Sequence, residues 1–205
     1  MTELLFPVGH YLGPHFPAGA DRPAGHRVRL GPSLRWLAGE PELLAWTLAH
    51  GLGELADPDQ PWDRAAVIAL GWELAGTDLT GAVAGLVERR LLVEVDPAAA
   101  GAAGFARAHR LRALMLALGA DPEEPDAVLL GAAGEPAVAL SARGHAFWAA
   151  GQHAPDLWQT CRAVAGGDPP DLLDELLGEL HGLLGAGTAY LDAAEGEQHA
   201  GVEIH

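Results

Sequence analysis

The stretch from Asp78 to Asp96 (DLTGAVAGLVERRLLVEVD) changes from a helical to a strand pattern with no loop signal between the two. In its first half the apolar residues recur three or four positions apart, as they do on one face of a helix, and in its second half they alternate, as in a half-buried strand. The helical positions are Leu79, Val83, Leu86 and Val87, and the alternating positions are Leu91, Val93 and Val95. We therefore predict a helix at Leu79–Arg90 that leads directly into a strand at Leu91–Val95.

A similar stretch recurs 97 residues further along the chain. At that offset Leu79, Gly81, Gly85 and Leu86 fall on Leu176, Gly178, Gly182 and Leu183. The order strand, helix, helix, glycine turn, helix, strand is also predicted in both halves. Repetition of one structural unit accounts for these matches, and chance matching in a chain rich in glycine and leucine is the alternative.

The first half, residues 1–120, is predicted to combine short strands with helices. A hairpin is expected in residues 1–31, which hold two apolar stretches around a link rich in Pro, Gly and His. The apolar stretches are Leu4–Leu12 and Arg27–Leu30. Helices are expected from Glu40 to Gly51 or Gly53, over Asp63–Leu74, over Leu79–Arg90, and over Phe105–Leu118, whose composition favours a helix.

The second half is predicted to follow a linker at residues 121–136, which is rich in Pro and Gly. A strand at Ala137–Leu140 would precede a helix capped by Ser141. The later elements are a helix at Asp156–Ala165, a helix at Asp171–Leu184 and a strand at Thr188–Leu191. The predicted fold class is mostly α (α+β), with a first module at residues 1–120, a second at residues 137–192, and small antiparallel β-ribbons.

Charge divides the chain more sharply than any other property. Residues 1–120 hold 13 acidic residues and 10 arginines, whereas residues 121–205 hold 15 acidic residues and 2 arginines. A polyanion would be repelled by the second half, so any contact with nucleic acid is expected in the first. The chain has no lysine, and its abundance of Ala, Gly, Pro and Arg indicates a GC-rich, bacterial coding bias.

Other features predict a folded protein of the cytoplasm. We find neither an apolar run long enough to cross a membrane nor a secretory signal pattern, so no membrane partner is expected. A single cysteine, Cys161, fits a reducing compartment.

No motif predicts catalysis, a metal or a cofactor. Cys161 lies among apolar residues of a predicted helix, where a thiol is usually inert. The loop histidines lack the paired spacing of a zinc site, and the acids of Asp171–Leu184 are expected to form a solvated face. We therefore expect a non-catalytic protein, and an enzyme is the third and least favoured hypothesis.

The chain resembles the winged-helix superfamily over Asp63–Leu74, the turn at Gly76–Asp78, the helix Leu79–Arg90 and the strand Leu91–Val95. The second module is similar in outline, which suggests two tandem degenerate copies. The resemblance implies one of two functions. Most winged helices dock their third helix in DNA, and a minority bind peptides or proteins, among them the recognition modules attached to peptide-modifying enzymes.

Binding of a peptide or protein partner is the favoured function, with a DNA-binding transcriptional regulator that uses helix 79–90 as the alternative. The middle of that helix carries small residues, so only Thr80, Glu88, Arg89 and Arg90 could reach bases or phosphates. Small residues on an exposed face also leave room for another chain. Trp36, beside Arg35, is the tryptophan most expected to be exposed, whereas Trp46 and Trp148 are expected in the core.

The predicted helix Phe105–Leu118 would present a basic face with Arg107, Arg110 and Arg112. This face could bind an acidic partner or pair with the acidic second module, and internal pairing is favoured. A homodimer through the apolar face of Asp171–Leu184 is a further possibility. The predicted binding residues are thus Thr80, Arg89, Arg90, Arg107, Arg110, Arg112 and Trp36.

Overall fold

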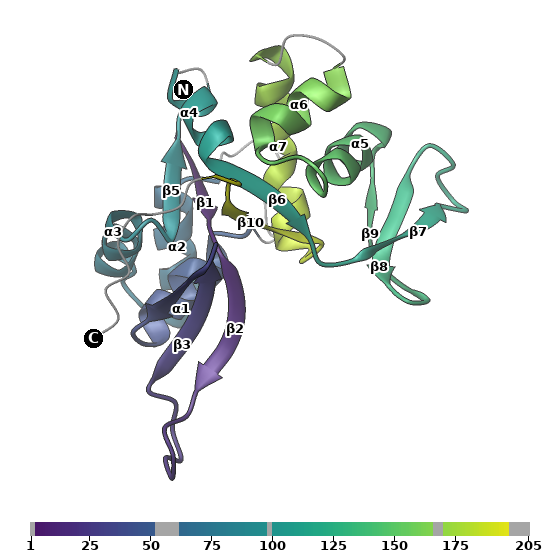
Figure 1. Cartoon of the computed structure of the whole chain (residues 1–205). Helices are drawn as coiled ribbons and strands as arrows, with labels where there is room; N and C mark the ends of the chain where they lie inside the picture. Colours follow the sequence, from purple (N-terminus) through teal and green to yellow (C-terminus); the bar gives the residue numbers. More distant parts are fainter. Residues whose placement is uncertain (1–2, 52–61, 98–99, 166–169, 197–205) are drawn as a thin grey trace.

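A computed structural model describes residues 3–51, 62–97, 100–165 and 170–196 (Figure 1). Within these ranges the chain forms seven helices and ten strands. The strands pair into two two-stranded ribbons and two three-stranded sheets, all antiparallel.

The first unit begins with a strand, continues through a three-stranded meander and a three-helix bundle, and ends with a strand that pairs with the first. The strands are β1 (Leu4–Pro7), β2 (His10–His15), β3 (Gly25–Leu30), β4 (Ser33–Leu37) and β5 (Leu92–Val95), and the helices are α1 (Glu40–Leu48), α2 (Arg64–Ala75) and α3 (Thr80–Glu88). The β1–β5 ribbon has Leu4 opposite Val95 and Pro7 opposite Leu92. The predicted passage from helix to strand near residue 90 is confirmed.

The second unit follows helix α4 (Ala100–Ala108) and repeats the same order of elements. Its strands are β6 (His109–Ala113), β7 (Leu116–Ala120), β8 (Val128–Ala132), β9 (Glu135–Leu140) and β10 (Ala189–Ala193), and its helices are α5 (Ala142–Gly151), α6 (Leu157–Ala165) and α7 (Pro170–Gly185). Strand β10 pairs with β6 as β5 pairs with β1. The described chain is therefore a tandem repeat of one strand–meander–three-helix–strand unit.

Equivalent hydrogen bonds at the end of the third helix support the repeat. The amide of Leu91 donates to the carbonyl of Leu86 (2.9 Å), and 97 residues later the amide of Thr188 donates to that of Leu183 (3.1 Å). This six-to-one bond is the mark of a Schellman helix end, whose penultimate residue is left-handed. That residue is Arg90 (φ 58°) in the first unit and Gly187 (φ 66°) in the second.

The start of each unit matches as well, so the repeat is longer than the sequence predicts. The amide of Val8 donates to the carbonyl of Leu91 (3.0 Å), and that of Leu114 donates to Thr188 (2.8 Å). The pairing of β2 with β3 shifts between Tyr11 and Gly13, and that of β7 with β8 shifts between Ala117 and Gly119. Both bulges are followed by a glycine with positive φ, 97° at Gly13 and 113° at Gly119.

The two left-handed helix ends yield a prediction on stability. A residue with a Cβ costs about 1 kcal/mol in the left-handed region, where glycine is unstrained. We expect Arg90→Gly to raise the free energy of unfolding by about 0.5–1 kcal/mol and Gly187→Arg to lower it by about 1 kcal/mol. Urea unfolding followed by circular dichroism measures both changes. Destabilisation by Arg90→Gly would contradict this account of the helix end.

The cores of the two units meet around β1 and α7. One apolar cluster lies within the first unit, and the other combines the second unit with α4 and residues of the first such as Phe6 and Val8. Trp46 and Trp148, each 5% exposed or less, are core residues as predicted. The apolar face of α7 is part of this core, because Leu176, Leu180 and Leu183 are fully buried, so this face is not available for the homodimer considered as a possibility.

The prediction of a mostly α protein is wrong, because 41% of the described residues are helical and 29% lie in strands. The predicted helix Phe105–Leu118 ends at Ala108, and β6 and β7 follow. Leu111 is the apolar residue between Arg110 and Arg112, an alternation typical of a strand. Pairing of this segment with β10 outweighs its helix propensity. The expected linker 121–136 contains β8, whose central Leu130 is fully buried in the core of the second unit.

Candidate functional site

A groove lies between β4 and the C-terminal end of α3. It encloses a volume of about 470 Å³. It is lined by Leu30, Leu34, Arg35, Trp36, Glu88, Arg89, Arg90 and Leu91. Three predicted binding residues, Trp36, Arg89 and Arg90, therefore come together here although 53 or more positions separate Trp36 from the arginines.

One wall of the groove is the outer edge of a sheet. Among the described residues strand β4 pairs with a strand on one side only, that of β3, which leaves its other side open to the groove. The carbonyl of Trp36 accepts a hydrogen bond from Arg89 Nη1 (2.9 Å) and so points away from β3. In an antiparallel strand the N–H and C=O of one residue point to the same side and alternate residues repeat the pattern. Leu34 and Trp36 thus present their main-chain groups to the groove.

The side chains along this edge are large and accessible. Leu34 is 48% exposed and Trp36 is 42% exposed, while the next residue, Leu37, is fully buried in the core. Trp36 also contacts the ring of His15 on β2, edge to face at 5.1 Å between centroids. An apolar anchor thus lies directly beside main-chain groups of β4 that do not pair with β3, of which the Trp36 carbonyl is bound by Arg89.

The groove is positively charged within an acidic protein. Arg89 forms an ion pair with Glu42 of α1 (2.7 Å) while it caps the edge of β4. Arg90 is exposed, and Arg35 Nε is buried with no hydrogen-bond partner among the described residues. Three arginines and one acid, Glu88, therefore line a site on a chain of net charge −16.

A second hollow continues the groove along β5. It also encloses about 470 Å³ and shares Leu30 and Arg90 with the first. Its other walls are formed by β5 and by helix α4, which contributes Gly101, Gly104 and Phe105. The two hollows meet at Arg90, so a chain longer than β4 could lie across both.

The remaining predicted binding residues lie elsewhere. Thr80 is at the opposite end of α3, where its amide binds the Asp78 carboxylate at 2.9 Å. Arg107 of α4 stacks on Trp158, with the guanidinium 4.1 Å from the ring centroid. Arg110 and Arg112 are on β6, so the predicted basic helix face does not exist.

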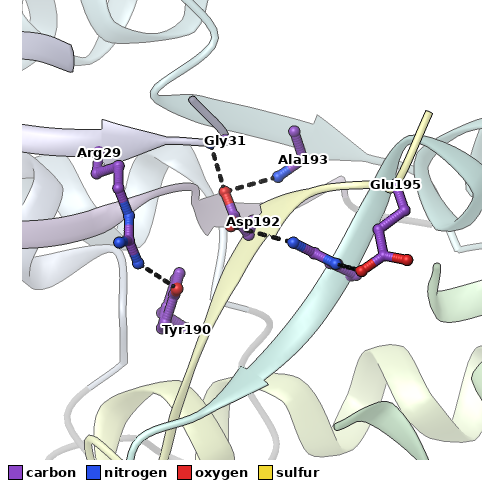
Figure 2. Close-up of polar contacts among 7 residues, drawn as sticks. Arg29, Gly31, Tyr190, Asp192, Ala193 and Glu195 are labelled. Carbon is purple, nitrogen blue, oxygen red and sulfur yellow. Dashed lines mark hydrogen bonds and ion pairs between the residues drawn. The ribbon is translucent and has the colours of Figure 1, made fainter. Parts of the chain in front are cut away.

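Arg110 instead confirms the predicted pairing with the acidic half of the chain. It contacts Asp192 (3.9 Å) and Glu195 (Figure 2). The Asp192 carboxylate, 4% exposed, also accepts the amides of Gly31 (2.6 Å) and Ala193 (3.0 Å). Because Gly31 lies between β3 and β4, this carboxylate holds the groove-bearing sheet of the first unit onto the last strand of the second.

A hydrogen bond from Arg29 to Tyr190 adds to the same junction. Arg29 Nη2 lies 2.8 Å from the tyrosine oxygen, and Tyr190 contacts the ring of His10. Burial beside Arg29 lowers the pKa of His10 below its usual value. A neutral imidazole at this position avoids charge repulsion with Arg29.

His181 on α7 is the most perturbed titratable group of the junction. Its ring stacks on Phe6 (4.4 Å between centroids), and Nε2 lies 2.9 Å from the carbonyl of Leu5. Burial, with a further contribution from His50, lowers its pKa to about 4. His181 therefore supports the fold as a neutral donor.

The single cysteine of the chain, Cys161, is buried on α6. Burial raises the pKa of the Cys161 thiol to about 11, which keeps it protonated. No group of three His, Cys, Asp or Glu side chains within the described ranges could hold a metal. No helix among the described residues is long and apolar enough to span a membrane.

Sequence reasoning missed Leu30, Leu34 and Arg35 as groove residues. The available signal was SLRWL at 33–37, where Leu34 and Trp36 alternate with polar Ser33 and Arg35. That pattern predicts a half-exposed strand. What the sequence does not show is that this strand is an edge strand and that α3 lies beside it.

No protein-family model, curated protein or solved structure matches the chain. The proposals that follow therefore depend on the geometry of the chain itself.

Proposed function

We propose that the protein is a non-catalytic regulator that binds an extended peptide segment of a protein partner in the groove between β4 and α3. The segment adds as a further strand to the open edge of β4, a recognised mode of peptide binding in which main-chain hydrogen bonds supply affinity and side-chain contacts supply specificity. The observation that carries the proposal is the juxtaposition of this open edge with exposed Leu34 and Trp36.

The order of elements supports kinship with peptide-binding winged helices. In the proposed assignment, α3 corresponds to the third helix and the β1–β5 ribbon to the wing. The groove then uses the helix end and a strand edge, as the peptide-recognition members of that superfamily do. Both units share the order of elements, and the groove with this lining lies in the first.

The lining indicates the chemistry of the bound segment. Leu34 and Trp36 favour apolar side chains on one side of the added strand. Arg35 and Arg90, which both line the groove, favour a carboxylate in the bound segment. We infer an extended segment that carries apolar residues at alternate positions and at least one Asp or Glu.

DNA binding by α3 is less well supported. The exposed positions of this helix include Thr80, Gly81, Ala84 and Glu88, which offer one short hydroxyl and one acid to base edges. Arg89, the side chain best placed to reach a phosphate, is bound to Glu42 and to the edge of β4. Addition of a peptide strand leaves the Arg89–Glu42 ion pair in place and displaces Arg89 only from the carbonyl of Trp36, whereas DNA binding through Arg89 would have to break both contacts.

A displayed peptide library tests the proposal. Selection on the full-length wild-type protein is expected to enrich extended segments with apolar residues at alternate positions and an acid. We expect Trp36→Ala to weaken binding of a selected peptide at least ~10-fold, because an aromatic anchor at the centre of an interface carries much of the affinity. Fluorescence anisotropy measures the dissociation constant.

Trp72→Ala is the matched control, because Trp72 is also exposed (57%) but lies on α2, outside the groove. It should leave the affinity unchanged. Leu34→Pro, which removes a main-chain donor from the edge, should abolish binding that Leu34→Ala retains in part. Equal affinities for Trp36→Ala and wild type would refute the site, and a salt-sensitive mobility shift of duplex DNA lost in Arg89→Ala/Arg90→Ala would favour the alternative.

A further inference from the structure

The two meanders share one fold but differ in chemistry. The strands β2, β3 and β4 carry three arginines (Arg27, Arg29 and Arg35) and three histidines. The strands β7, β8 and β9 (LALGA, VLLGA and EPAVAL) carry a single charged residue, Glu135. Because the sheet is almost uncharged, any partner that binds it would do so through apolar contacts and not through ion pairs.

The second meander also exposes leucines along an open edge. Within the described ranges strand β7 pairs with β8 on one side only, and all five of its residues are exposed. Leu114 is 47%, Leu116 61% and Leu118 36% exposed. In Figure 1 this sheet projects from the molecule beyond α5, so a partner can approach it without obstruction from the helices.

The bend between β6 and β7 corresponds to the bend between β1 and β2 in the first unit. The second unit covers this bend of the first. Val8, the counterpart of Leu114, is fully buried, and the amide of the next residue, Gly9, donates to the carbonyl of Leu191 on β10 (2.7 Å). The same bend in the second unit has larger apolar side chains and lies in solvent. In the first unit, this bend is therefore a surface at which the other unit binds.

Native edge strands usually carry charges or proline that prevent pairing with another chain. The edge of β4 is capped by Arg89, and β9 has Glu135 and Pro136 at its start. Strand β2 includes Pro14 and two histidines. Strand β7 has neither a charge nor a proline, and its bulge at Gly119 is its one protective feature.

We propose that β7 is the self-association surface of the protein, at which a second copy docks edge to edge about a two-fold axis. The flanking charges fit this arrangement. Arg112 precedes the strand, and the acids Asp121, Glu123 and Glu124 follow it. An antiparallel pair brings the basic end of each strand towards the acidic end of its partner, and the uncharged centre avoids the repulsion expected between two copies of net charge −16.

Sedimentation velocity over a concentration series of the full-length protein tests this proposal. Wild type is expected to form a concentration-dependent dimer. Leu116→Glu, which introduces a charge at the centre of the strand, should raise the dissociation constant at least ~30-fold. Leu74→Glu is the matched control, because Leu74 is exposed to a similar extent (53%) on α2, and it should dimerise as wild type does.

The double variant Leu116→Ser/Leu118→Ser provides a second test without added charge, and it should also weaken the dimer. Circular dichroism checks that each variant is folded. A wild-type protein that is monomeric at every concentration would overturn the proposal. So would a dimer that is equally stable in Leu116→Glu. Binding of a monomeric wild type to neutral phosphatidylcholine vesicles, lost in Leu116→Glu, would also overturn it and would assign this sheet to a lipid surface.

Discussion

The protein is expected to lose about 3 kcal/mol of folding free energy at His181 as the pH falls from 6.5 to about 4. Burial against Phe6, with His50 nearby, lowers the pKa of the folded imidazole to about 4. In the unfolded chain the group has its ordinary pKa of 6.5. Between these values the unfolded state binds a proton that the folded state does not, so stability is complete above this window and decreases as the pH falls through it.

Urea unfolding at a series of pH values measures this loss. His181→Gln is the matched variant, since its amide can still donate to the carbonyl of Leu5 but does not titrate. The variant should lose less stability than wild type over the window, by up to about 3 kcal/mol, while other titrating groups affect both proteins alike. Identical pH profiles for the two proteins would show that His181 does not stay neutral in the fold.

Asp192→Ala is expected to cost about 3 kcal/mol, since it removes one member of a buried charged pair and leaves its partners unsatisfied. The carboxylate is 4% exposed and accepts the amides of Gly31 and Ala193, with Arg110 beside it (Figure 2). Removal would leave the Gly31 amide without its acceptor at the contact between the two units. The free energy of unfolding, measured in urea, reports the cost.

Asp192→Asn is the control for this prediction. Its amide oxygen can still accept the Gly31 amide, but it lacks the charge that attracts Arg110. We expect a cost intermediate between those of wild type and Asp192→Ala. If the alanine variant unfolded at the same urea concentration as wild type, Asp192 would not be a significant link between the units.

The parts of the fold that could be predicted from the sequence are those in which local pattern and tertiary structure agree. Asp63 caps α2 through the amide of Ala66 (2.8 Å), and Ser141 caps α5 through that of Gly144 (2.9 Å). The four matching positions at an offset of 97 residues lie in α3 or at its N-cap and in α7, and these two helices have equivalent C-terminal ends. The caps involve residues close in sequence, and the repeat consists of identical residues at a fixed offset, so both signals are visible in a single chain.

The parts that could not be predicted depend on pairing between distant segments. The residues of β7 and β8 are Leu, Ala, Gly and Val, which a helix or a linker also uses, and only their register in a sheet makes them strands. Strand β6 forms because β10, some 80 residues later, supplies its partner. The same holds for the groove, since Trp36 and Arg89 are brought together by packing of α3 beside an edge strand.

The most direct test of the proposed function is amide hydrogen exchange at β4 with and without a selected peptide. Strand addition predicts that the amides of Leu34 and Trp36, which face the groove, become strongly protected when the peptide binds, whereas the amide of Arg35, already directed towards β3, changes little. A peptide that binds tightly while Leu34 and Trp36 exchange as fast as in the free protein would contradict it.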